Sequence, residues 1–97
     1  MNSQFGDRIR TLREKQGLFL RQVAAFLEMD TAQLSKIEKG LRQFKKEQLP
    51  ALANLLKADL EELQTLWLTD QLYNIVKGEP MADEALKSVS KKIKKSK

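Results

Sequence analysis

Residues 20–40, LRQVAAFLEMDTAQLSKIEKG, constrain the fold most, because they combine two short helical patterns with a tight turn between them. Asp30, followed three residues later by Gln33, resembles an acidic capping box that starts the second helix, and Gly40 is placed to end it. The sequence therefore predicts two consecutive amphipathic helices. Their apolar residues at helical spacing are Leu20, Val23, Ala24 and Leu27 in the first, and Leu34 and Ile37 in the second.

Further helical patterns flank this pair, and neither a strand pattern nor an internal repeat accompanies them. The first predicted helix covers residues 5–16 and ends at Gly17, a position suited to a left-handed cap. A fourth helix is predicted to begin near Glu47, because Pro50 is compatible only with a first turn. Together these patterns predict an all-α fold.

A long fifth helix is predicted to begin after Asp59, which forms an acidic capping box with Glu62, and to continue until Gly78. Its apolar residues cover more than one face, so one side of a small domain cannot cover them all. A sixth helix with a single apolar stripe is predicted from about Ala82. We expect the last lysines to fray into a solvated tail: Lys91, Lys92, Lys94, Lys95 and Lys97.

The composition excludes several kinds of chemistry. The 97 residues include no cysteine and no histidine, which rules out disulfides, thiolate nucleophiles and Cys/His zinc sites. No phosphate-binding loop or catalytic set is visible, so we expect no enzyme, cofactor or metal. The chain shows no secretion signal and no apolar run of membrane length. We therefore expect a cytoplasmic protein with neither a membrane partner nor a small-molecule effector.

The net charge of +5 is unevenly distributed along the chain. Residues 1–58 contain eleven Lys/Arg and six Asp/Glu, whereas residues 59–97 contain seven of each. The part with the helix pair therefore carries the whole positive excess, which suits a polyanionic partner. Charge alone is also compatible with a basic domain that is merely soluble.

Four landmarks within residues 5–68 resemble the Xre/Cro-type helix-turn-helix regulators, which include phage repressors and restriction–modification controller proteins. In order along the chain, these landmarks are RIRTLREKQGL, QVAAFL, QLSKIEKG and LPALANLL. The resemblance implies a five-helix Cro/repressor-like helix-turn-helix domain in residues 1–68. Outside the resemblance, the apolar pattern alone predicts that the rest of an extended fifth helix and an additional C-terminal helix form a dimerisation extension in residues 69–97. Double-stranded DNA is the implied partner, and transcriptional regulation the implied function.

The resemblance implies that the exposed face of the helix at residues 31–39 reads bases in the major groove. Lys36 can donate to guanine O6 and N7, and Gln33 can pair with adenine N6 and N7. An ordinary solvated face of an amphipathic helix would show the same pattern without the landmarks. The implied base-contacting residues are Thr31, Ala32, Gln33, Ser35 and Lys36.

The basic loop LRQFKK after this helix matches the segment that contacts phosphate in the family. Phosphate contacts set the register of a protein on DNA without reading its sequence. The backbone amides of Leu41 and Gln43 are expected to assist the cationic side chains. A charged, solvated loop is the alternative, above all for Lys46. The implied phosphate-contacting residues are Leu41, Arg42, Gln43, Lys45 and Lys46.

Arg13 and Glu38 match a pair that bridges the first helix to the end of the third in the family. Such a partly buried ion pair would fix the angle at which the third helix leaves the core. Removing one partner would leave a buried charge unpaired, at a cost of about 3 kcal/mol. The alternative is two unrelated surface charges.

Several residues depart from the family pattern at the start of the helix pair. Phe19 and Leu20 stand where Ser or Thr followed by Gln is usual, so neither can provide the usual cap or phosphate hydrogen bond. Glu28 stands where the turn usually has glycine, and a left-handed backbone there would cost about 1 kcal/mol. Asp30 either caps the third helix or accepts a hydrogen bond from cytosine N4–H. Recognition is therefore assigned to residues 31–36 and the basic loop.

The chain is predicted to act as a homodimer, because one small domain reads too few bases for useful specificity. Two copies would read the two halves of a palindromic operator. The predicted interface on the fifth helix comprises Leu66, Trp67, Leu68, Leu72, Tyr73 and Val76. Part of this apolar surface is also expected to pack on the sixth helix, and a monomer covered by that helix is the alternative.

A second function is compatible with the same helices. The apolar surface of the fifth helix would then bind a different protein, as in an adaptor or an antitoxin-type partner. A stable heterocomplex that does not bind upstream DNA at physiological salt would favour this function. The operator, the target genes and the direction of regulation are not encoded in any recognisable pattern.

Overall fold

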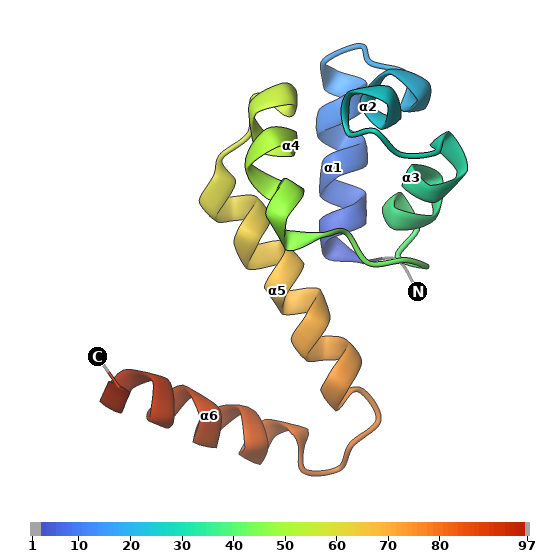
Figure 1. Cartoon of the computed structure of the whole chain (residues 1–97). Helices are drawn as coiled ribbons and strands as arrows, with labels where there is room; N and C mark the ends of the chain where they lie inside the picture. Colours follow the sequence, from blue (N-terminus) through green and yellow to red (C-terminus); the bar gives the residue numbers. More distant parts are fainter. Residues whose placement is uncertain (1–2, 97) are drawn as a thin grey trace.

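The computed structural model describes residues 3–96 and is helical throughout the regular elements of that part (Figure 1). This confirms the predicted all-α fold. The helices are α1 (Gln4–Lys15), α2 (Leu20–Phe26), α3 (Thr31–Glu38), α4 (Leu49–Leu56), α5 (Leu60–Val76) and α6 (Ala82–Ser96), with a 3₁₀ turn, η1 (Lys46–Gln48), before α4.

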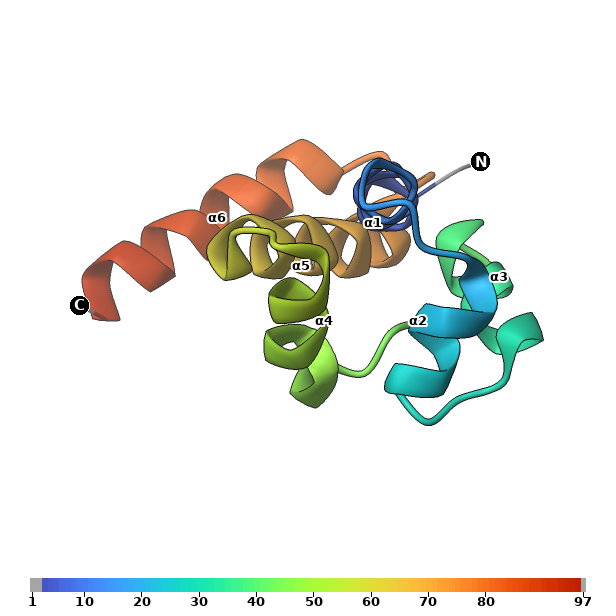
Figure 2. The ribbon, with the colours of Figure 1, turned by 90° about the horizontal axis from the view of Figure 1, so that it is seen from above.

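One core holds α1 to α4 and the first half of α5 together. Helix α1 lies at its centre, in contact with α3, α4 and α5, while α2 packs on α3 and α4 packs on α5. Figure 2 shows α2 and α3 on one side of α1, and α4 and α5 on the other. The side chains that lose nearly all solvent contact come from every one of these helices: Ile9, Val23, Leu34, Ile37, Leu49, Leu52, Leu56 and Leu63.

Left-handed residues end four of the helices. Gly17 and Gly40 have φ of 70° and 77°, as predicted from the sequence, while Glu28 and Lys57 adopt 57° and 55° without being glycine. At Gly40 the next amide, Leu41 N–H, donates to Lys36 O at 2.8 Å, and Gly40 N–H donates to Ile37 O. These two bonds form a Schellman motif that stops α3 sharply.

The predicted capping boxes are only partly formed. Asp30 is the N-cap of α3, but its carboxylate makes no capping hydrogen bond, so this predicted box is wrong. Asp59 does cap α5, by accepting from Glu61 N–H at 3.1 Å. Its expected partner, Glu62, instead forms an ion pair with Arg8 at 3.1 Å. The carboxylate of Glu62 therefore ties α5 to α1 rather than closing its own helix.

Helix α5 is continuous through residue 68, where the sequence predicted the end of the DNA-binding domain. Two residues further on, the Asp70 carboxylate accepts from Gln4 N–H at 3.2 Å and from Phe5 N–H at 3.0 Å. Free amides at a helix N-terminus favour a carboxylate partner. The compact part of the molecule therefore includes Asp70.

Helix α6 leaves this body after Gly78, whose φ is 78°, and extends away from α1 to α4 (Figure 1). None of its described residues is buried, so α6 does not provide the cover expected for α5. The expectation of a frayed tail is also wrong for residues 91–95, which lie within the helix. Acidic residues in its first turn and lysines in its last favour the helix dipole. Lys97 lies outside the described residues.

Candidate nucleic-acid interface

The second helix of the pair, α3, is anchored by one face and exposed on the other. Leu34 and Ile37 are buried, and their spacing turns the rest of the helix outward. Gln48 supports the turn before α3, because its Nε2 donates to Leu27 O at 2.9 Å. Of the predicted base-contacting residues, Thr31, Ala32 and Lys36 are exposed, and Gln33 and Ser35 are half-buried.

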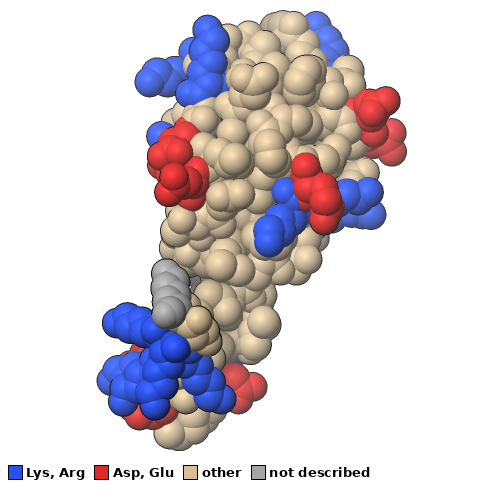
Figure 3. Space-filling model, turned by 60° about the vertical axis from the view of Figure 1, so that its left-hand side comes forward, with Lys and Arg blue, Asp and Glu red and all other residues tan. Residues whose placement is uncertain are grey.

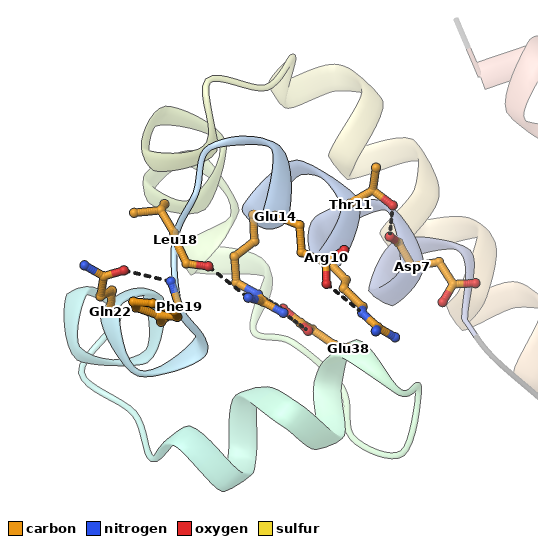
Figure 4. A network of polar contacts seen from close by, with 9 residues as sticks. Asp7, Arg10, Thr11, Glu14, Leu18, Phe19, Gln22 and Glu38 are labelled. Atoms are coloured by element: carbon orange, nitrogen blue, oxygen red, sulfur yellow. Dashed lines mark hydrogen bonds and ion pairs between the residues drawn. The ribbon is translucent and has the colours of Figure 1, made fainter.

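Arg13 and Glu38 form the predicted ion pair, in a bidentate geometry (Figure 4). Arg13 Nε donates to Glu38 Oε2 at 2.8 Å and Nη2 donates to Oε1 at 3.1 Å, while Nη1 donates to Leu18 O. Their side chains are only 11% and 6% exposed. The hydrogen bonds to Glu38 raise the pKa of Arg13 above its ordinary value, so the guanidinium stays charged. It joins α1, the loop before α2 and the end of α3.

A second contact sets the same junction by close packing. Gly6 in α1 lies against the backbone carbonyl of Glu38, and a Cβ at this position would overlap that oxygen. Such a Cβ would also lie 2.7 Å from Ser3 Oγ, which accepts the Gly6 N–H. Helices approach this closely only where one of them lacks a side chain. The end of α3 is thus fixed by both an ion pair and a backbone contact.

The loop that follows α3 is anchored by a residue that the sequence analysis did not select. Phe44 is buried, with its ring centre 5.6 Å from that of Phe5, and its carbonyl accepts from Trp67 Nε1 at 2.7 Å. The aromatic residue within LRQFKK could have indicated an anchor in the core, but its basic neighbours favoured the interpretation of an exposed loop. With Phe44 inward, five loop residues are exposed: Leu41, Arg42, Gln43, Lys45 and Lys46.

One predicted phosphate contact must be corrected. The backbone amide of Leu41 already donates to Lys36 O, so it is not available to a phosphate oxygen. The Leu41 side chain, 73% exposed, has no polar atom to take its place. The cationic residues Arg42, Lys45 and Lys46 carry the charge of this loop.

At the start of α2, Arg21 packs on the unusual Phe19. The Arg21 guanidinium lies 4.6 Å from the ring centre of Phe19, a cation–π distance, and both residues are exposed. The side chain of Gln22 caps the N-terminus of α2, because its Oε1 accepts Phe19 N–H at 2.7 Å. Sequence analysis passed over Arg21 because it lies outside the family landmarks.

The predicted interface on α5 divides into two parts. Leu66 and Trp67 are half-buried and pack partly against the core of their own chain, so only part of each side chain is open to a partner. Leu68, Leu72 and Tyr73 are exposed, and Val76 is half-buried. Ile75, which the sequence analysis left out, is 72% exposed. The uncovered apolar surface therefore lies on the second half of α5.

Comparison with known protein families matches residues 4–66 to a helix-turn-helix domain. The chain therefore belongs to this family of DNA-binding domains, which agrees with the resemblance to Xre/Cro-type regulators. Comparisons with curated proteins and with solved structures find no match. The family assignment ends before the second half of α5 and excludes α6.

Within residues 3–96, every helix is too short or too polar to span a membrane. Among the same residues, no group of three or more His, Cys, Asp or Glu side chains is arranged to hold a metal ion.

Proposed function

We propose that this protein is a sequence-specific transcriptional regulator that binds a palindromic operator as a homodimer. The observation that carries the proposal is the helix pair itself. Helix α3 is held against α1 through Arg13, Glu38 and Gly6. Its residues Thr31, Ala32 and Lys36 remain exposed. A helix held at a defined angle with polar residues outward is what major-groove reading requires.

The proposed contacts divide into two classes. Residues on α3 read bases: Lys36 and Gln33 by hydrogen bonds, Thr31 and Ala32 by methyl contacts, and Ser35 by its hydroxyl. The loop residues Arg42, Gln43, Lys45 and Lys46 bind phosphate, and Arg21 adds a phosphate contact at the start of α2, the helix that crosses the backbone in this class of domain.

Binding experiments separate these classes. The operator is first obtained by selection of bound oligonucleotides, and the affinities for operator and scrambled duplex are then compared. Lys36→Ala is expected to lower the operator preference roughly tenfold, because a base contact is worth about 1–3 kcal/mol of discrimination. Arg42→Ala is expected to weaken both duplexes equally and to reduce the salt slope by about one. Lys77→Ala, an exposed lysine at the end of α5, is the control. Equal wild-type affinity for operator and scrambled DNA would refute specific recognition.

The exposed apolar surface of α5 favours a second candidate, an adaptor or antitoxin-type partner of another protein. Copurification of the chain in a stable heterocomplex, together with no shift of upstream DNA at physiological salt, would support this candidate instead. A homodimer that shifts operator DNA alone would exclude it.

A further inference from the structure

Helix α6 carries a continuous apolar stripe that its own chain leaves uncovered. Ala82, Leu86, Val89 and Ile93 follow one another at intervals of four, three and four residues. This is the spacing of the seam between two helices of a coiled coil. The three large residues remain 37%, 46% and 54% exposed, in chain order.

The arrangement of the molecule explains why this stripe needs a partner. Helix α6 extends away from the body, clear of α1 to α4 (Figure 1), and none of its residues, all described, is buried. A single helix of this length is only marginally stable in water, even with favourable residues. Its apolar face therefore has to be covered by something outside the chain.

The order of charges along α6 identifies that partner. Asp83 and Glu84 lie in the first turn, whereas Lys91, Lys92, Lys94 and Lys95 occupy the last turns. Figure 3 shows basic side chains gathered at the α6 end of the molecule, away from the helix-turn-helix body. A second α6 running parallel would place lysines beside lysines. An antiparallel copy would place each acidic end beside the partner's basic end.

We propose that the α6 helices of two copies pair antiparallel, with the two-fold axis close to Val89 and the stripes of both helices in the seam. The pairing rests on the homodimer proposed above and identifies which surface forms it. An antiparallel pair is self-complementary and closed, as a two-fold dimer requires. The exposed residues of α5, Leu68, Leu72 and Ile75, would extend the same interface.

Sedimentation equilibrium without DNA tests the seam. Val89→Lys places a charge in the stripe, and Ser88→Lys places the same charge one residue away on the outer face. We expect Val89→Lys to raise the dimer dissociation constant at least tenfold, while Ser88→Lys leaves it within twofold of wild type. An unchanged constant for Val89→Lys, or a wild type that is monomeric at millimolar concentration, would overturn the proposal.

Charge reversal tests the direction of pairing. Asp83→Lys with Glu84→Lys makes both ends of α6 basic, so it weakens an antiparallel dimer but leaves a parallel one unchanged. Changing all four lysines of residues 91–95 to Glu makes both ends acidic. An equimolar mixture of the two variants is expected to form a heterodimer with at least tenfold tighter association than either variant alone, which checks that these charges lie beside the seam but not the direction of pairing. Circular dichroism checks that both variants remain helical. No weakening by the Asp83/Glu84 variant would overturn the antiparallel arrangement.

The outcomes distinguish this pairing from the proposed function. If wild type binds its operator as a dimer and Val89→Lys dimerises equally well, the seam is wrong and the function stands. If Val89→Lys dissociates the dimer but wild type shows no operator preference, the seam stands and the function is wrong.

Discussion

Two regions of this chain have similar apolar patterns in sequence, but only one of them buries its apolar face. The helix pair α2–α3 and the terminal helix α6 are both amphipathic, with apolar residues at helical spacing. The first region buries its apolar face in a shared core, whereas no described residue of α6 is buried. Periodicity thus identifies which face of a helix needs cover, but it does not identify the element that covers it.

This difference in burial goes with a difference in what each region can contribute to the protein. Around α3, an ion pair, a close backbone contact and a Schellman motif fix one geometry, which is what a reader of bases needs. The second half of α5 and α6 instead present apolar and charged surface outward. If this comparison is correct, substitutions in the first region should change stability, and those in the second should change association.

The largest effect is expected at the buried ion pair. Glu38→Gln leaves the Arg13 guanidinium buried with a neutral partner, so the free energy of unfolding should fall by about 3 kcal/mol. Urea unfolding, followed by the fluorescence of Trp67, the only tryptophan, measures it. Glu14→Gln is the matched control, because Glu14 pairs with Arg10 on the surface at 3.4 Å. A loss no larger than that of the control would mean that the pair does not hold α3 in place.

Close packing between α1 and α3 gives the next effect. Gly6→Ala places a methyl group against the Glu38 carbonyl, and relief of this overlap should cost about 2 kcal/mol. Because the overlap displaces the end of α3, operator affinity should fall as well. Thermal unfolding and DNA titration measure the two effects. Ala25→Ser, an exposed site on α2, serves as the control. A fully stable Gly6→Ala variant would show that the helices can separate freely.

Sequence reasoning succeeded where the determinants are local or belong to the family pattern. Gly17 and Gly40 were placed by the need for left-handed backbone, and Arg13 with Glu38 by the resemblance. It failed where a residue acts across the fold. Phe44 was hidden among basic neighbours, and the contact of Asp70 with α1 joins residues 65 and 66 positions apart.

The same physical reason explains why the sequence alone did not show that Trp67 packs partly on its own core. An apolar helix with an aromatic residue predicts a binding surface equally well whether the ring faces the core or a partner. Only the fold shows that the indole N–H donates to the Phe44 carbonyl. The other four predicted interface residues, Leu68, Leu72, Tyr73 and Val76, lie in the second half of α5, which precedes α6.

A smaller effect on stability tests where the compact body of the molecule ends along α5. Asp70→Ala removes the carboxylate that accepts the Gln4 and Phe5 amides, so unfolding should become easier by about 1 kcal/mol. Asp70→Asn should recover part of this loss, because its amide oxygen still accepts. Urea unfolding of both variants checks the order. Equal stability of wild type and Asp70→Ala would limit the compact body to residues before Asp70.

The smallest change in stability is expected when the whole of α6 is removed. Removing residues 78–97 takes away α6, none of whose described residues is buried, so the free energy of unfolding of the monomer should change by less than about 0.5 kcal/mol. The full chain should gain thermal stability as its concentration rises, because dimerisation stabilises the folded state by mass action, and the shortened chain should not. Thermal unfolding at several protein concentrations measures both quantities. A shortened chain that unfolds more easily at the lowest concentration would place α6 in the core of its own chain. An equal dependence on concentration in both proteins would assign association to α5 alone, and the associating surface would then end at Val76 rather than continue into α6.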